Sequence, residues 1–140
     1  NYAFRLLSYR SRSQKEISER LRNRGYPEPV INTIIEELKN TGLIDDKKFA
    51  IMFAQDRLNF AKKGKRIIFA ELLRKGVPKP DVEEALKKIN DETAVAKKLI
   101  EKYKKRYTRL EPDKRRKKLY DLLLRRGFSF KVVEEIMEEI

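Results

Sequence analysis

The sequence predicts an all-α protein made of three tandem three-helix repeats, helix-turn-helix-like, stacked into an elongated curved rod. Three observations lead to this prediction. Gly25, Gly76 and Gly127 lie 51 residues apart (76 − 25 and 127 − 76) in similar segments. Apolar residues recur at three- and four-residue steps, the spacing of amphipathic helices. All five prolines fall at expected helix starts, where the first turn tolerates them.

The similarity between the three segments extends to both sides of the glycine. Each glycine follows a basic residue and precedes an apolar one. Apolar residues also recur at fixed offsets: Ile17, Ile68 and Leu119; Leu21, Leu72 and Leu123; Ile31, Val82 and Val133; Ile34, Ala85 and Ile136; Leu38, Ile89 and Ile140. One unit is therefore used three times, with expected domains at 1–44, 45–90 and 91–140. A unit of under ~50 residues buries little core alone, so we expect neighbouring units to pack together.

The first repeat shows start and stop signals for each helix. Its helices are expected over 2–11, 13–24 and 28–40. Ser13 and Glu16 have the spacing of a capping box. Gly25 is expected to end the second helix in a left-handed conformation, with Arg24 facing the negative helix end. Gly42 follows the third helix.

The second and third repeats carry the same signals. Helices are expected over 46–62, 66–75 and 79–89, then over 91–107, 113–126 and 130–140. Gly64 is expected at the end of the first helix of repeat 2. Ser129 can cap the last helix. Helix-end electrostatics account for the basic residues before each glycine: Arg24, Arg74, Lys75, Arg125 and Arg126.

The adjacent carboxylates of Asp45 and Asp46 raise the question of a catalytic or metal-binding pair. They follow Gly42 and precede an apolar-periodic segment, "KKFAIMFA". Asp45 is placed to cap the next helix, and Asp46 falls in the first turn, where the helix dipole favours an acid. Consecutive helical residues point in different directions, so the two carboxylates would not converge on one ion. We interpret the pair as a cap.

Composition excludes several kinds of chemistry. The chain has no cysteine and no histidine, which removes disulfides, thiolate metal sites and the commonest general base. We therefore expect no enzyme activity, no catalytic residue, no metal and no cofactor. No segment approaches the roughly 18 apolar residues of a membrane span, and no signal peptide opens the chain, so we expect a cytoplasmic protein.

The charge balance points to a polyanionic partner. Lys and Arg number 35 against 22 Asp and Glu, a formal net charge of +13. Such an excess favours nucleic acid first, and an acidic protein face or an anionic membrane second. No base-reading helix is evident, because the last helices of the repeats are acidic and would be repelled from a groove.

Two basic clusters are the candidate binding residues. Each lies between the first and second helices of its repeat, a one-sided placement suited to tracking phosphates. The repeat-2 cluster is Lys62, Lys63, Lys65 and Arg66. The repeat-3 cluster is Lys104, Lys105, Arg106, Arg109, Arg115, Arg116, Lys117 and Lys118. A merely solvated face is the alternative for either cluster. Tyr103 and Tyr107 could stack on bases, although core packing is the favoured role.

Two motifs resemble a known family. "GLIDDKKFA" (42–50) is similar to the G-L-[ILD]-D-D-x-[RK]-[FY]-A signature of the RecX family, regulators of the RecA recombinase. "ELLRKGV" (71–77) is similar to the family's E-L-x-x-K-G-[VI] motif. The resemblance covers nearly the whole chain. Before the second motif, Lys62, Lys65 and Ile67 stand where the family has Gly, Pro and Arg, which makes this turn more basic.

The resemblance implies a non-catalytic modulator of recombination, DNA repair and the SOS response. It implies a protein that binds RecA and its filament on single-stranded DNA, with duplex DNA a further candidate. Such a protein would change strand exchange, ATP hydrolysis and co-protease activity, and inhibition is the expected sign. We expect a monomer without a membrane partner. The alternatives are a sequence-nonspecific nucleic-acid-binding helical repeat protein and, least favoured, an enzyme such as a nuclease.

Overall fold

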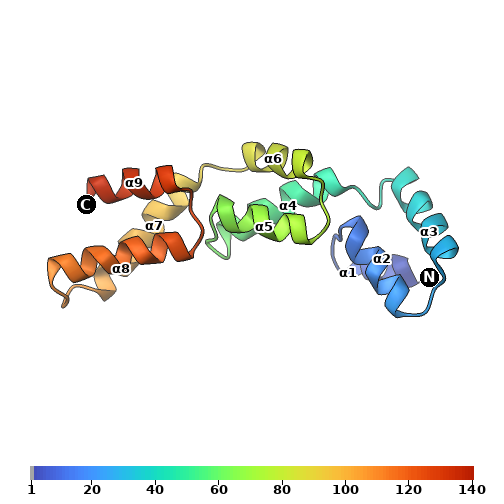
Figure 1. The fold of residues 1–140 in the computed structure, drawn as a ribbon, viewed down its shortest axis with the longest axis horizontal. Coiled ribbons are helices and arrows are strands. Elements are labelled where there is room, and N and C mark those ends of the chain that lie inside the picture. Colours follow the sequence, from blue (N-terminus) through green and yellow to red (C-terminus); the bar gives the residue numbers. More distant parts are fainter. Residues whose placement is uncertain (1) are drawn as a thin grey trace. The chain divides into compact units, whose positions relative to one another are not determined.

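The structure, a computed structural model, describes residues 2–140. All regular secondary structure in these residues is α-helical, and turns connect the helices (Figure 1). The helices are α1 (Tyr2–Tyr9), α2 (Gln14–Asn23), α3 (Glu28–Asn40), α4 (Asp46–Asn59), α5 (Lys65–Arg74), α6 (Lys79–Lys88), α7 (Glu92–Arg106), α8 (Pro112–Arg125) and α9 (Phe130–Glu139). We call α1–α3 repeat 1, α4–α6 repeat 2 and α7–α9 repeat 3. The predicted all-α tandem-repeat fold is confirmed.

The helices gather into two compact units. One comprises Asn1–Met52 with Glu71–Lys87, and the other comprises Phe53–Ala70 with Lys88–Ile140, so the division runs through repeat 2. In the first unit, α2 packs against α1 and α3. In the second unit, α7, α8 and α9 pack against one another in all three pairs.

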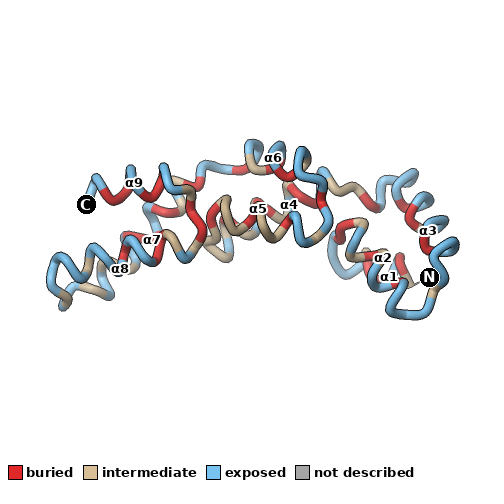
Figure 2. Tube along the Cα trace, viewed as in Figure 1, coloured by how far each residue is buried: buried red, intermediate tan, exposed pale blue. Residues whose placement is uncertain are grey.

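The core of each repeat uses the apolar positions that recur in the sequence. Buried segments recur along the helices, shown red in Figure 2. The residues eight and four positions before each repeat glycine are almost fully buried in all three repeats: Ile17, Ile68 and Leu119, and Leu21, Leu72 and Leu123. Burial of each such side chain contributes about 1.5–3 kcal/mol to folding. The last recurring position departs from the pattern, because Ile140 is exposed whereas Leu38 and Ile89 are buried.

The repeat glycines end the second helix of each repeat, as predicted. Gly25, Gly76 and Gly127 have φ angles of 93°, 84° and 85°. A glycine adopts this left-handed conformation without the steric penalty of a Cβ atom. At Gly76 and Gly127, an added Cβ would also collide with a side chain of the preceding repeat, Lys15 and Ile67 respectively.

One helix end differs from the prediction. Helix α4 ends at Asn59, three residues earlier than expected, and Gly64 does not form its end. Lys62 instead takes the left-handed conformation, with a φ of 56°. Gly64 is buried directly before α5, where a Cβ atom would collide with the backbone of Phe128. The glycine is therefore needed for a close approach between two backbone segments.

Most of the predicted caps are present. Ser13 and Glu16 form a complete capping box. Asp45 accepts hydrogen bonds from the backbone N–H groups of Lys47 and Lys48 at 3.1 and 3.2 Å, so its cap role is confirmed. Ser129 occupies the N-cap of α9, but its side chain makes no capping hydrogen bond.

Candidate functional site

The repeat-2 cluster (Lys62, Lys63, Lys65 and Arg66) lies on the turn between α4 and α5, in the second unit. Lys62 and Lys63 belong to the turn, and Lys65 and Arg66 open α5; all four are half-buried. The Nζ of Lys62 donates to the carbonyl oxygen of Asn59. The backbone N–H of Lys63 donates to the Arg57 carbonyl at 3.1 Å. The turn is thus held by its own hydrogen bonds.

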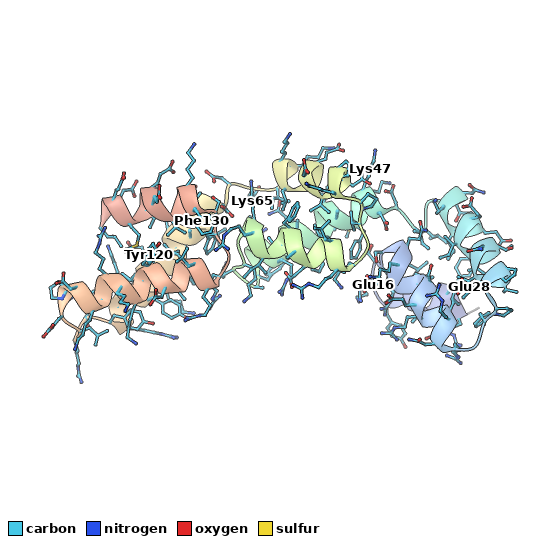
Figure 3. The ribbon with its side chains drawn as sticks, viewed as in Figure 1. Glu16, Glu28, Lys47, Lys65, Tyr120 and Phe130 are labelled. Carbon is cyan, nitrogen blue, oxygen red and sulfur yellow. The ribbon has the colours of Figure 1, made fainter. Side chains whose placement is uncertain are left out.

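Arg66 binds repeat 3 through its side chain. Its Nε donates to the carbonyl of Phe128 and its Nη2 to the carbonyl of Leu124, both at 2.9 Å. The guanidinium also lies over the ring of Phe130, 4.4 Å from its centroid (Phe130 and Lys65 are labelled in Figure 3). Two of the donor atoms of Arg66 are therefore committed to the turn between α8 and α9.

The start of α5 is closed to ligands on its backbone side. The N–H groups of Gly64 and Arg66 donate to the carbonyls of Arg126 and Gly127, at 2.7 and 2.9 Å. The N–H of Lys65 donates to a carboxylate oxygen of Glu92 at 2.7 Å. A free helix N-terminus can hold an anion through such groups, but these are occupied. These three N–H groups are therefore not available to a phosphate, and the lysine side chains are the candidate contacts.

Glu92 is a structural residue of this region that the sequence analysis missed. Its side chain is almost completely buried, with a residue exposure of 2%. One oxygen accepts from Lys65 N–H and the other from Ser129 N–H at 2.9 Å. Asp91, the preceding residue, caps α7 by accepting from Thr93 N–H, and this hydrogen bond lowers the pKa of Asp91.

In the first unit, repeats 1 and 2 are connected by the same type of contact, in which a carboxylate accepts from the N–H of the first residue of a helix in the preceding repeat. Asp46 accepts from the backbone N–H of Gln14, the first residue of α2, at 2.9 Å. The hydroxyl of Ser13 donates to the carbonyl of Lys75 at 2.7 Å. Burial raises the pKa of Asp46, against the effect of the hydrogen bond from Gln14. The two aspartates of "GLIDDKKFA" thus cap different helices.

The repeat-3 cluster (Lys104, Lys105, Arg106, Arg109, Arg115, Arg116, Lys117 and Lys118) surrounds the turn between α7 and α8. Four of its members make contacts within their own repeat. Arg106 lies 4.8 Å from the ring of Tyr103, and Lys118 lies 5.6 Å from the ring of Tyr107. Arg115 donates to the Leu110 carbonyl at 3.0 Å, and Lys104 approaches Glu101 at 3.8 Å.

The remaining four members are exposed: Lys105, Arg109, Arg116 and Lys117. Within the part of the chain that the structure describes, no carboxylate forms an ion pair with any of them. Their charges are therefore available to a partner. No hydrogen bond or ion pair in residues 2–140 joins the repeat-2 cluster to the repeat-3 cluster.

The helix dipole favours Lys105, in the last turn of α7, but it does not explain the basic residues at the starts of α8 and α5. Five consecutive basic residues, Lys114–Lys118, lie in the first two turns of α8. Lys65 and Arg66 likewise open α5, whose first turn contains no acid. The N-terminal end of a helix carries a partial positive charge and is stabilised by acids. These basic residues work against that preference, which favours a role in binding.

Tyr103 and Tyr107 are half-buried and contact each other, with ring centroids 6.0 Å apart. The Tyr103 hydroxyl also accepts a hydrogen bond from Arg126 at 3.4 Å. Arg126, for which the sequence predicts only a helix-end role, donates in addition to the carbonyl of Ala61 at 3.2 Å. This arrangement agrees with packing as the main role of the two tyrosines.

Repeat 1 carries a group of basic residues around Tyr2, of which the sequence analysis considered only Arg24, as a helix-end residue. The guanidinium of Arg24 lies over the ring of Tyr2 at 4.1 Å, and that of Arg5 at 5.8 Å. Tyr2, Arg20, Asn23 and Arg24 line one shallow pocket. Burial raises the pKa of the Tyr2 hydroxyl, but Arg24 and Arg20 outweigh it, and the net pKa is lowered. An aromatic residue at position 2, on the helix that packs beside Arg24, is the sequence feature that could have indicated these contacts.

Residues 2–140 contain neither a metal site of acidic side chains nor a helix that could span a membrane. No group of three or more acidic side chains there is placed to hold a metal ion. No helix in the same range combines the length and the apolar character needed to cross a bilayer. The prediction of a cap at Asp45 is confirmed, and the absence of catalysis stays a prediction.

Comparison with known protein families matches all three repeats. Residues 1–38 match the family model described as RecX, first three-helix domain. Residues 45–86 match the second three-helix domain of RecX, and residues 90–137 match the third.

Comparison with individual proteins agrees. Regulatory protein RecX of Bacillus cytotoxicus is 34% identical over 140 residues, covering 99% of this chain and 52% of that protein. One from a Mycobacterium species is 36% identical over 134 residues, covering 91% and 73%. The crystal structure of RecX from Lactobacillus salivarius has a TM-score of 0.90 and 31% identity, covering 99% of this chain and 92% of that one. This chain spans about half the length of the Bacillus relative. It belongs to the RecX family.

Proposed function

We propose that this protein is a non-catalytic regulator that binds a RecA-type recombinase filament on single-stranded DNA and lowers its activity. Membership of a family whose relatives are named regulatory proteins supports a regulatory role. The observation that carries the nucleic-acid part is the set of exposed, unpaired cations around the turn between α7 and α8, namely Lys105, Arg109, Arg116 and Lys117. No ion pair within residues 2–140 neutralises these charges, so contacts within the described residues do not account for them.

The charged side chains would act on phosphates rather than on bases. Lys63, Lys65, Lys105, Arg109, Arg116 and Lys117 make no ion pair within residues 2–140. A long-range attraction of this kind brings a polyanion to the surface and fixes its position without reading its sequence. Helix α9, with four glutamates and one lysine, would face a protein partner or water, because it repels phosphates.

Regulation would then depend on how much of the filament is occupied by the bound protein. A monomer bound along a filament, in the cytoplasm where DNA repair and the SOS response take place, would contact DNA phosphates and recombinase together. It would hinder the changes that accompany ATP hydrolysis, strand exchange and co-protease activity. Such a mechanism uses no cofactor and no catalytic side chain. The effect depends on the concentration of the protein, as binding linkage requires.

The binding surface is tested by the salt dependence of affinity for a single-stranded oligonucleotide. Each phosphate contact contributes about 0.7 to the slope of log affinity against log salt. Lys63→Ala with Lys65→Ala should therefore flatten the slope by ~1.4 and leave sequence preference unchanged. This pair is chosen because Lys62 and Arg66 hold the turn. The matched control is Lys79→Ala with Lys87→Ala, two exposed lysines on α6.

A sequence-nonspecific nucleic-acid-binding repeat protein is the second candidate function. The same unpaired cations favour it, because they require only phosphates. The two functions separate on one observation, namely whether the protein changes the ATPase rate of a preformed recombinase filament. A general DNA-binding protein would change that rate only by competing for free DNA.

A further inference from the structure

The side chain of Phe60 is an aromatic ring exposed to solvent. Its exposure is 82%, whereas Phe49 and Phe128 are buried. Phe60 directly follows α4 and precedes the repeat-2 cluster. A single exposed apolar side chain is common on protein surfaces, so a role for this ring must be argued from its backbone and its surroundings.

The chain holds this ring on a well-defined turn. The N–H of Phe60 donates to the carbonyl of Asp56 at 2.9 Å, which continues the hydrogen-bonding pattern of α4. Lys62 adopts a left-handed φ of 56°, a conformation that is strained for a residue with a Cβ atom. Gly64 then anchors the end of the turn on Arg126. The ring is therefore presented on a fixed backbone.

The surroundings of Phe60 are cationic. Between residues 53 and 70 there are five basic residues and one acid, Asp56. Lys63 and Lys65 lie within five residues of the ring and have no carboxylate partner within residues 2–140. A ligand with flat apolar faces and a negatively charged backbone matches both features. Single-stranded nucleic acid has that chemistry, because its base faces are free of a paired strand.

The equivalent position of repeat 1 supports this interpretation. Tyr9 lies 51 residues before Phe60 (60 − 9), the same period as the repeat glycines. It directly precedes the turn to α2 and is 85% exposed. An exposed aromatic ring before the second helix is thus a feature of two repeats and is not confined to one turn.

We propose that Phe60 is a stacking platform for a nucleobase of single-stranded nucleic acid whose adjacent phosphates are held by Lys63 and Lys65. This inference rests on the nucleic-acid part of the proposed function and adds a residue that contacts bases. The half-buried Tyr103 and Tyr107, already packed with each other and with cations, are poorer platforms. Stacking is tolerant of sequence, because every base has an aromatic face.

The absence of tryptophan from the chain allows a direct test. Phe60→Trp introduces a single indole fluorophore at the proposed platform, and Leu43→Trp places one at another exposed site on the α3–α4 connection. The probes are a 15-nucleotide oligo(dT) and an abasic 15-mer with the same phosphates. Oligo(dT) should quench the indole emission of the Phe60→Trp variant, whereas the abasic strand should not. The emission of the Leu43→Trp variant should respond to neither strand. Unchanged emission of the Phe60→Trp variant in its saturated complex with oligo(dT) would overturn the proposal.

Affinity provides the second measurement. Phe60→Ala should weaken binding of oligo(dT) about five- to a hundredfold, with an unchanged salt slope. Phe60→Tyr should bind like the original protein. If Phe60→Ala retains full oligo(dT) affinity but loses filament regulation, the ring docks on protein; the stacking proposal is then wrong while the regulatory function stands. If the protein binds no oligo(dT) at all, the platform is refuted, and the filament assay alone decides the proposed regulation.

Discussion

The carboxylate of Glu92, at the start of repeat 3, accepts a hydrogen bond from the backbone N–H of Lys65, the first residue of the second helix of repeat 2. Asp46 makes the same contact with Gln14 between repeats 2 and 1. Each acid directly follows the aspartate that caps its own helix, Asp45 or Asp91. The pairs of adjacent acids therefore cap one helix in their own repeat and one in the repeat before.

The two inter-repeat acids should respond differently to loss of charge. Asp46 accepts one backbone hydrogen bond, and the amide oxygen of Asp46→Asn can replace it. Glu92 accepts two on separate oxygens, and Glu92→Gln would turn an amide NH₂ toward one of the donors. We expect Glu92→Gln to lower the free energy of unfolding by about 2 kcal/mol, and Asp46→Asn by less than about 1 kcal/mol. Urea denaturation measures both, and equal losses would refute the difference.

Alanine substitutions at two glycines should also differ in how much they lower the free energy of unfolding. Gly25 has a positive φ but free space around it, so Gly25→Ala should cost about 1 kcal/mol from backbone strain alone. In Gly64→Ala the new Cβ would collide with the backbone of Phe128, which cannot rotate aside. We expect a loss of about 3 kcal/mol there, in the upper range for overpacking. Thermal or urea unfolding that ranks Gly25→Ala as the more harmful change would contradict the close approach at Gly64.

Glu16 should make stability depend on pH. Its burial opposes the charged form, but hydrogen bonds from Arg10 and from the Ser13 N–H, with the charge of Lys75, lower its pKa to about 2. A depressed carboxyl pKa stabilises the folded state above the unfolded pKa, and the effect is lost as pH falls toward the folded value. Glu16→Gln should therefore cost roughly 2 kcal/mol at neutral pH, and the cost should shrink between about pH 5 and pH 2.

Asp46 should make stability depend on pH in the direction opposite to that of Glu16. Because its folded pKa is raised, the folded state takes up a proton before the unfolded state does. The original protein should gain stability relative to Asp46→Asn as pH falls through the folded pKa of Asp46. Parallel pH series on the two variants give these slopes, and slopes of the same sign would contradict the assignment.

The protein should show no metal-dependent catalysis. Asp45 and Asp46 bind different helices, and no other acidic group in residues 2–140 is arranged to hold a metal. We expect highly purified protein to leave labelled DNA and ATP unchanged in Mg²⁺ or Mn²⁺. DNA cleavage that disappears in the folded double variant Asp45→Ala with Asp46→Ala would refute this.

Local signals made the helices and their ends predictable from sequence. Gly25, Gly76 and Gly127 determine backbone conformation by themselves, and the apolar offsets around them repeat in each unit. The end of α4 was mispredicted, because a lysine took the conformation that glycine usually adopts. Lysine has no intrinsic preference for this conformation, which occurs here in a turn held by hydrogen bonds from Lys62 Nζ and Lys63 N–H.

The basic clusters were identifiable from sequence as groups, but the contacts of their individual members were not. The density of Lys and Arg identified both basic clusters. The commitment of Arg66 to Phe128 and Leu124, and the partnership of Glu92 with Lys65, join residues 27 or more positions apart. Such pairings depend on how repeats dock, which periodicity within one repeat does not specify. The exposure of Phe60 likewise appears only once the turn is built.

The measurement that tests the proposed regulation most directly is the steady-state ATPase rate of a RecA-type filament preformed on single-stranded DNA, titrated with this protein. We predict that the rate falls as the protein is added. Lys63→Ala with Lys65→Ala should require more protein for the same inhibition, whereas Lys79→Ala with Lys87→Ala should act like the original. An unchanged rate at concentrations that saturate bare single-stranded DNA would contradict filament regulation and leave a general nucleic-acid-binding protein.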